Sequence, residues 1–300
     1  MTAPEFQDQE SWEHEVNGYL TEFEPKLMDW SAAKVFATKN LKIALRYPAN
    51  LLVWGLLPIL WFSPYLFMAN AVGGFGTSAS FIELSGFTDF IQFCVIGWFV
   101  FMYLDNSIWA VGNNFRWEQF SGTLEPLFLA PVPRISILLG AAFSDTIQGT
   151  VQALVLLGLS TLLFGVTYTA IAIAPTVILL TIMVTALYGF SFMLAGLIMV
   201  FKDPSVLTQL ISETTYMVSP INYPLQALPG NVRFLAYLVP TTIALVTIRH
   251  IAITGVFEIW SFLQALTVLG LLGLLLWGIG LVVFQYAERW TKKRGHMGGF

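Results

Sequence analysis

The sequence predicts an all-α integral membrane protein with six transmembrane helices. The first observation is composition: of 300 residues, 56% are hydrophobic and 11% are charged, whereas soluble domains carry about 25% charged residues. The second is a set of six apolar segments, each near the roughly 20 residues that a spanning helix needs. The third is an uneven distribution of basic residues among the connections between them. Together these observations exclude an ordinary soluble globular domain.

The six apolar segments are the predicted spans. The first contains Pro58 and Pro64, so a kinked helix is expected there. The fifth is the least apolar of the six. The predicted spans are residues 49–69, 89–111, 136–164, 171–200, 205–223 and 260–285.

The stretch before the last predicted span is interrupted by prolines. Pro224, Pro229 and Pro240 break an otherwise apolar sequence, which is too interrupted for a clean span and too apolar for an ordinary loop. Irregular backbone at membrane depth occurs where protein or a cavity covers it. We expect a pair of short re-entrant or interfacial helices within residues 222–250.

Basic residues set the expected orientation. Of the 14 lysines and arginines, 12 lie in the N-terminal region, the 112–135 loop, the 201–204 turn and the C-terminal region, and 2 lie elsewhere, Arg233 and Arg249. Cytoplasmic connections carry the excess of positive charge. Both termini and the 112–135 loop are therefore predicted to be cytoplasmic, and the segments 70–88, 165–170 and 224–259 to face outward.

An amphipathic helix is predicted just before the first span. Within residues 26–47, Lys34, Thr38, Lys42 and Arg46 recur every four residues and share one helical face. Such a helix lies at the membrane interface with its basic side toward the headgroups. Two roles remain open: a membrane anchor alone, or a strut that links the membrane domain to a cytoplasmic component.

The two ends of the chain are predicted to be cytoplasmic tails. Residues 1–25 are acidic and polar, and 8 of the 18 acidic residues precede position 30. Without a basic start and an apolar core, this segment is not a signal peptide; a solvated tail is expected. Residues 291–300 form a basic flank. The single cysteine, Cys94, lies in an apolar run and is expected to be buried and inert.

The 112–135 loop is the largest polar excursion between spans. Thr123 can cap a short helix, Pro126 is tolerated in its first turn, and Pro131 ends it. This helix presents apolar side chains, as a surface gripped by another protein does. The alternative is an interfacial turn whose apolar residues dip into lipid. Those residues are Leu124, Leu127, Phe128 and Leu129.

This loop resembles the coupling helix of the membrane subunits of ABC-2 type transporters, the type V ABC exporters. Their pattern is E-x-x-x-G-T-L-E-x-L followed by P-x-x-R. By this resemblance the coupling helix spans residues 118–134 and docks on an ATPase, with Phe128 as a further contact. The matching residues are Glu118, Gly122, Thr123, Leu124, Glu125, Leu127, Pro131 and Arg134.

A second match lies in the proline-broken segment. The family carries F-P-L-x-x-L-P, then L-N-P-L-T, then a late arginine, in an extracellular re-entrant segment. Val239 stands here where the family has asparagine, which leaves the backbone break intact. The resemblance covers residues 25–290, including a six-span domain at 48–290. The matching residues are Pro224, Leu225, Leu228, Pro229, Pro240, Thr241 and Arg249.

The resemblance implies a permease subunit and no enzyme. The chain contains no G-x-x-x-x-G-K-[ST] and no Gly-Lys pair, so it has no P-loop. The resemblance implies two copies of a separate ATP-binding subunit, which binds ATP and Mg. It also implies a second permease copy that forms a homodimer with this one. The expected location is a prokaryotic inner membrane, where lipid surrounds the permease. The expected cargo is an amphipathic drug-like molecule or lipid. A lipid-linked polysaccharide is the alternative, because aromatic residues such as Trp54, Trp61 and Trp98 are abundant.

By resemblance, spans two and five line the translocation path. Intramembrane acids are costly and usually face a cavity or the bundle interior, so Asp105 and Glu213 are candidates, while Asp145 suits a structural hydrogen bond better. Ordinary packing or helix-to-helix hydrogen bonding is the competing interpretation. The candidate path residues are Phe99, Met102, Tyr103, Asp105, Glu213, Tyr216 and Met217.

Other function classes receive less support from the sequence. His14, His250 and His296 are far apart and form no metal-binding pattern. No catalytic arrangement is recognisable, which disfavours a membrane enzyme, and the basic groups flank spans, so no nucleic acid partner is expected. An ATP-independent secondary transporter or channel remains the alternative from a different class, although we find no inverted repeat.

Overall fold

The described part of the chain is built from helices. The computed structural model describes residues 28–73, 79–123, 126–127, 130, 132–200 and 204–294. Every element in these ranges is an α-helix or a short 3-10 helix. The predicted all-α class is therefore confirmed.

In the described part of the chain, four helices are long and apolar enough to cross a membrane alone. They are α5 (Phe90–Phe120), α7 (Arg134–Phe164), α8 (Ile173–Val200) and α12 (Ile259–Arg294). They coincide with the second, third, fourth and sixth predicted spans. Each closes its backbone hydrogen bonds internally, which hydrocarbon demands.

Two further pairs of helices meet at sharp bends. The predicted interfacial helix is α2 (Trp30–Arg46), which meets α3 (Pro48–Gly73) at 85°. The short helices α10 (Gly230–Tyr237) and α11 (Pro240–Thr254) meet at 93°. Counting each bent pair as one span gives up to six candidate spans among the described residues.

The fifth predicted span is wrong in length. The helix there, α9, covers Pro204–Val218, only 15 residues. At about 1.5 Å per residue it is about 22 Å long, shorter than a hydrocarbon core of about 30 Å. Pro220 explains the early end, because the residue before a proline is pushed out of the helical region. The remaining described elements are α4 (Ala79–Ser85), η2 (Ala170–Ala172) and η3 (Leu225–Ala227).

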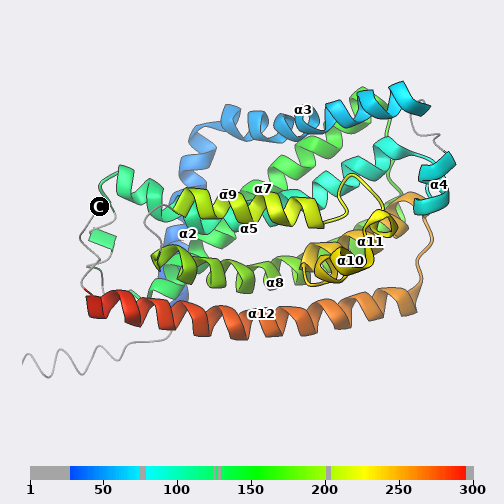
Figure 1. The fold of residues 1–300 in the computed structure, drawn as a ribbon. Helices are drawn as coiled ribbons and strands as arrows, with labels where there is room; N and C mark the ends of the chain where they lie inside the picture. The colour runs from blue at the N-terminus through cyan, green and yellow to red at the C-terminus, as the bar shows by residue number, and fades with distance from the viewer. Residues whose placement is uncertain are drawn as a thin grey trace, which may run out of the picture.

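The bundle is arranged around α5 (Figure 1). Of the apolar stretch of α5, 78% is buried, against 17% for α12, because α7, α8, α9 and α11 pack around α5. Helices α3 and α12 lie on opposite sides of the bundle. Helices α8 and α12 approach closely where Gly189 meets Gly280, since a side-chain carbon at either position would overlap the facing backbone. Small residues of this kind let membrane helices pack at short range.

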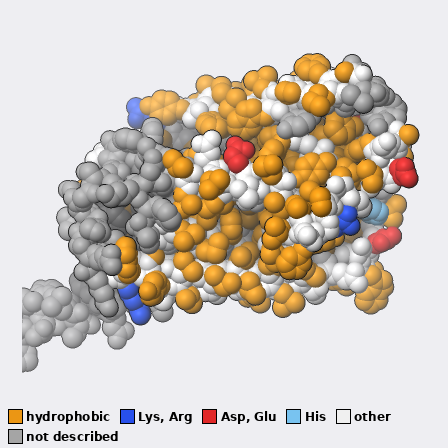
Figure 2. All heavy atoms as spheres, viewed as in Figure 1, with side chains coloured by type: hydrophobic (Ala, Val, Ile, Leu, Met, Phe, Trp, Pro, Cys, Tyr) orange, Lys and Arg blue, Asp and Glu red, His pale blue; other side chains and the backbone are white. Residues whose placement is uncertain are grey.

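The outer surface of the bundle is apolar. Figure 2 shows hydrophobic side chains over most of one face, with few charged groups among the described residues. Leu162 and Leu274 are 81% and 72% exposed. A water-soluble protein of this size rarely exposes a continuous apolar surface so large. The apolar outer surface and the long apolar helices identify the chain as a multi-pass membrane protein.

Candidate functional site

The connection between α5 and α7, residues 121–133, begins with a tight turn. Gly122 has φ +67°, a left-handed conformation that favours glycine. The Thr123 amide then donates to the Glu118 carbonyl at 2.9 Å, and the Leu127 amide donates to the Thr123 carbonyl at 3.2 Å. Both bonds lie in the segment where the sequence predicts a short helix. Four predicted docking residues lie outside the described residues: Leu124, Glu125, Phe128 and Pro131.

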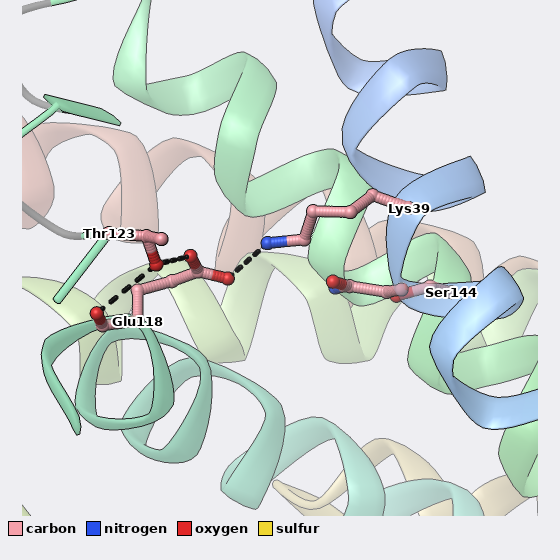
Figure 3. Close-up of polar contacts among 5 residues, drawn as sticks. Lys39, Glu118, Thr123 and Ser144 are labelled. Carbon is pink, nitrogen blue, oxygen red and sulfur yellow. Dashed lines mark hydrogen bonds and ion pairs between the residues drawn. The ribbon is translucent and has the colours of Figure 1, made fainter. Parts of the chain in front are cut away.

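Glu118, at the end of α5, is buried and held by two partners (Figure 3). Its carboxylate forms an ion pair with Lys39 of α2 and accepts a hydrogen bond from the Thr123 hydroxyl at 2.5 Å. Only 6% of Glu118 is exposed. The Thr123 hydroxyl thus binds Glu118 and does not act as a simple helix cap, and Pro126, three residues on, has no N–H to offer it. Glu118 therefore anchors the α5–α7 connection and presents little surface to another protein.

Lys39 is a site residue that the sequence did not indicate. It lies off the stripe of Lys34, Thr38, Lys42 and Arg46, since five residues from Lys34 correspond to a rotation of about 140° around the helix. It reaches inward over the ring of Phe36, with its ammonium group 4.4 Å from the ring centroid. The predicted stripe itself contains exposed residues, with Lys34, Thr38, Lys42 and Arg46 all at the surface.

Apolar contacts continue the attachment of the connection to α2. Leu127 and Val132 are partly buried against Phe36 of α2 and against Ile137 and Ala141 of α7. Leu127, a predicted docking residue, thus faces inward. In contrast, the turn at 121–123 and Pro126 are exposed, so that the described residues of the connection form an inner, packed side and an outer, exposed side.

Helix α2 is joined to the beginning of α7 along its length. The Asp29 carboxylate caps α2 by accepting from the Ser31 amide at 2.8 Å, and the Asp29 amide donates to the Ser136 hydroxyl at 2.7 Å. Further along, the Asn40 side-chain nitrogen donates to the Ser144 hydroxyl at 3.3 Å. Between these contacts Gly140 of α7, which has no side chain, lets the α2 backbone approach α7 closely. Helix α2, the α5–α7 connection and the first turns of α7, which begins at Arg134, therefore form one packed unit.

The candidate path residues separate into buried and exposed groups. Phe99, Met102 and Tyr103 of α5 are only 8%, 7% and 7% exposed, because neighbouring helices cover α5. On α9, Glu213 is exposed and Met217 is 71% exposed. Of the candidate path residues, only Glu213 and Met217 thus lie open on the surface.

Asp105 and α9 are linked across the helix interface. The Ser212 hydroxyl donates to the Asp105 carboxylate at 2.6 Å, and Glu213, the other acid among the candidate path residues, follows Ser212 in α9. Tyr216 packs against Trp98 and Phe101, with ring centroids 5.6 Å and 5.3 Å apart. The acidic pair therefore borders an aromatic group on the side of α5 that α9 covers.

Asp145 lies in a different polar site, inside one subunit. It lines a cavity of about 10 Å³ between α5, α7 and α8, the space that a single buried water requires. Tyr188 donates to the Ala142 carbonyl there at 3.2 Å, and Thr146 and Tyr188 are 2.7 Å apart. This setting suits a structural role. Among the described residues no group of three His, Cys, Asp or Glu could hold a metal ion.

The prolines of the predicted re-entrant segment each mark the start of a helix. Pro224 precedes η3, Pro229 precedes α10, and Pro240 is at the first position of α11, where a missing N–H costs nothing. Arg249, in α11, is 3% exposed and bonds to backbone carbonyls. The break that the sequence predicts is therefore present as three short helices.

Comparison with known families gives one result. Residues 32–253 match the family described as ABC-2 type transporter. The match runs from α2 to α11 and includes the α5–α7 connection, both bent helix pairs and the acidic pair. No curated protein matches the chain.

Proposed function

The chain belongs to the ABC-2 type transporter family, and we propose that it is the permease subunit of an ATP-driven exporter of an amphipathic drug-like molecule or lipid. Family members generally work with an ATP-binding subunit, and the family's membrane domain has no nucleotide-binding domain of its own. The observation that carries the proposal is the α5–α7 connection, which is fixed on its inner side and exposed on its outer side.

The connection is the proposed docking site for the ATPase. A docking element transmits movement only if it is firmly attached to the helices that it moves. Glu118 and Leu127 supply that attachment through Lys39 and Phe36 of α2. The outer turn at Gly122 and Thr123, followed by Glu125 and Phe128, is the part that contacts the ATPase. This assignment gives α2 the role of a strut.

The ATPase supplies the energy in this proposal. Two copies of it bind ATP and Mg, and their closure around ATP pushes the two connections as rigid bodies. Rigid-body movement at an interface is a common way of passing a local change to distant helices. The permease chain contributes no nucleotide contact, in keeping with its lack of any Gly-Lys pair.

A second permease copy is proposed to cover the exposed face of α9. Val206, Leu210 and Met217 are 66%, 63% and 71% exposed on that helix, and they recur at helical spacing on one side. A homodimer most simply pairs through a two-fold axis. In that arrangement the α9 helices of both copies face the path between them.

An amphipathic cargo fits the chemistry of that face. Exposed apolar side chains of α9 would contact its hydrocarbon part, and Glu213 with Asp105 behind it would contact a polar or cationic part. A polysaccharide remains the alternative: Trp98 and Phe99 are buried in the core and offer no stacking surface to sugars, but Trp54 and Trp61 of α3 are each 48% exposed.

The proposed location is a prokaryotic inner membrane with both termini and the α5–α7 connection in the cytoplasm. The basic residues support this orientation: Lys34, Lys42 and Arg46 are exposed on α2, next to the connection. Outward-facing segments carry few basic residues, as the positive-inside rule expects.

Reconstitution tests the proposal. The permease in liposomes, with and without its ATPase, should transport cargo only with ATPase and ATP. Glu125→Arg, two positions after the exposed turn in the sequence, should abolish coupling while leaving insertion and stability intact. Lys34→Met, on the exposed stripe of α2, should change neither coupling nor insertion. Transport by the permease alone, without ATP, would support a secondary transporter or channel and overturn the proposal.

A further inference from the structure

Helix α5 connects two distant parts of the molecule. It runs over 31 residues without a proline, about 45 Å at 1.5 Å per residue. Glu118 lies near one end, at the α5–α7 connection. Near the other end α5 contacts the α10–α11 hairpin, the bent pair of short helices (Figure 1). An unbroken helix of this kind carries displacement from one end to the other.

The hairpin is attached to α5 by a buried arginine. The Nε atom of Arg249 donates to the Phe93 carbonyl of α5 at 3.0 Å, and the Arg249 guanidinium carbon lies 3.5 Å from the centroid of the Phe93 ring. The Nη1 atom donates to the Pro220 carbonyl at 2.6 Å, and Nη2 donates to the Ile221 carbonyl. One side chain thus joins α11, α5 and the end of α9.

The chemistry of this contact is unusual for a buried cation. None of the described carboxylates forms an ion pair with Arg249; its acceptors are backbone carbonyls. The carbonyls of Pro220 and Ile221 follow the last turn of α9, where helical partners are missing, and both residues are buried away from bulk water. The rigid fork of donors on a guanidinium reaches carbonyls that lie apart from one another, whereas the three donors of a lysine share a single nitrogen atom.

Gly97 of α5 makes the contact possible. A side-chain carbon at this position would overlap both the Arg249 guanidinium and the Ile221 carbonyl. The next residue adds a second bond: the Trp98 indole donates to the Asn222 side-chain carbonyl at 2.9 Å. Two consecutive positions of α5 therefore hold the segment 220–222, which leads into the hairpin.

From these contacts we infer that Arg249 is a positioning residue that fastens the α10–α11 hairpin to α5, so that the hairpin moves with α5 when the α5–α7 connection is displaced. The inference rests on the proposed function, since the ATPase provides the displacement. It adds a mechanical route between opposite ends of the permease: the connection, then α5, then Arg249, then the hairpin.

Two cysteine reporters test this route in the assembled complex with its ATPase. One replaces Phe234, which is 67% exposed on α10; the other replaces Thr38, exposed on α2. The native Cys94 is fully buried and serves as the background. The measurement is the labelling rate with a soluble maleimide, with and without ATP and vanadate. In the protein that keeps Arg249, ATP should change the labelling rate of both reporters.

In Arg249→Met the response of the Phe234 reporter should fall at least about fivefold, the lower end of coupling between distant sites. The Thr38 reporter and ATP hydrolysis should be retained. The matched control is Arg233→Met, because Arg233 donates to the Gln226 and Leu228 carbonyls within the hairpin region itself and does not reach α5; its Phe234 response should persist. If Arg249→Met fails to assemble, Gly97→Ala carries the same expectation.

The outcomes separate the two claims. A full ATP response at Phe234 in Arg249→Met or Gly97→Ala overturns the inference alone. The inference is also overturned if, in the protein that keeps Arg249, the Thr38 reporter responds to ATP and the Phe234 reporter does not. If neither reporter responds to ATP, the proposed function is contradicted, and so is the inference that rests on it.

Discussion

Replacing Glu118 by Gln removes the charge that joins α5 to α2 while keeping the side-chain shape. Glu118 accepts from both Lys39 and Thr123. A glutamine has one acceptor oxygen in place of two, and its amide nitrogen cannot accept. The remaining oxygen can still accept from Lys39, and the Thr123 hydroxyl can accept from the amide nitrogen, but the negative charge opposite Lys39 is lost, so the attachment of the α5–α7 connection to α2 weakens.

The size of the effect follows from the burial of the two partners. The Glu118 side chain is 8% exposed, but that of Lys39 is 41% exposed and can regain water. The cost therefore lies between that of an exposed ion pair, about 0–1 kcal/mol, and that of breaking a buried pair, about 3–5 kcal/mol. A cost of about 2 kcal/mol corresponds to a shift of about 30-fold in an equilibrium.

The assay is the ratio of transport to ATP hydrolysis in proteoliposomes. For Glu118→Gln this ratio should fall by up to about 30-fold, because hydrolysis continues while movement is transmitted less often. Lys42→Met is the matched control, a lysine of the same helix on its exposed face, and should leave the ratio unchanged. A double-mutant cycle of Glu118→Gln with Lys39→Met, read by thermal unfolding, should give a coupling energy of about 1–2 kcal/mol.

Two results would refute the reasoning. One is a coupling energy below about 0.3 kcal/mol, the level at which independent sites are simply additive. The other is an unchanged ratio of transport to hydrolysis in Glu118→Gln, with the protein correctly assembled.

Three other consequences can be measured. Gly280→Leu should lower the free energy of unfolding by about 1–3 kcal/mol, because it overpacks the contact with α8. Gly270 has open space around it, so Gly270→Leu should have little effect. Equal stabilities of the two variants would contradict the close packing of α8 and α12. Asp105→Asn keeps an acceptor for its serine partner, so the fold should persist while transport of cationic cargo falls more than that of neutral cargo; equal losses would argue against contact with a cation. Leu210→Cys, in a chain lacking its native cysteine, should cross-link two copies in the membrane, and its failure to do so would count against the proposed dimer face.

The membrane fold was predictable from the sequence because hydrocarbon imposes a simple rule. Long apolar runs must close their own hydrogen bonds, so α5, α7, α8 and α12 follow from hydropathy and length. The end of α9 did not follow from that rule. Apolar and polar residues continue past Val218 without a change in composition, and only the backbone restriction imposed by Pro220 ends the helix.

The contacts that hold the candidate site in place could not be predicted from sequence patterns. Lys39 and Glu118 are 79 positions apart, and Ser212 lies 107 positions from Asp105, so their pairing depends on how the helices assemble. The sequence indicates the contacts of Arg249 even less, because its acceptors are backbone carbonyls, which every residue possesses. The resemblance located the motif at Glu118, but only the folded structure shows that this carboxylate faces inward.

The most direct test of the account is transport by the reconstituted permease with its ATPase. We predict uptake into inverted vesicles that requires ATP, stops with vanadate, and disappears in the Glu125→Arg variant while the permease remains inserted. Cargo movement by the permease alone, at the same rate and indifferent to both ATP and vanadate, would contradict the account.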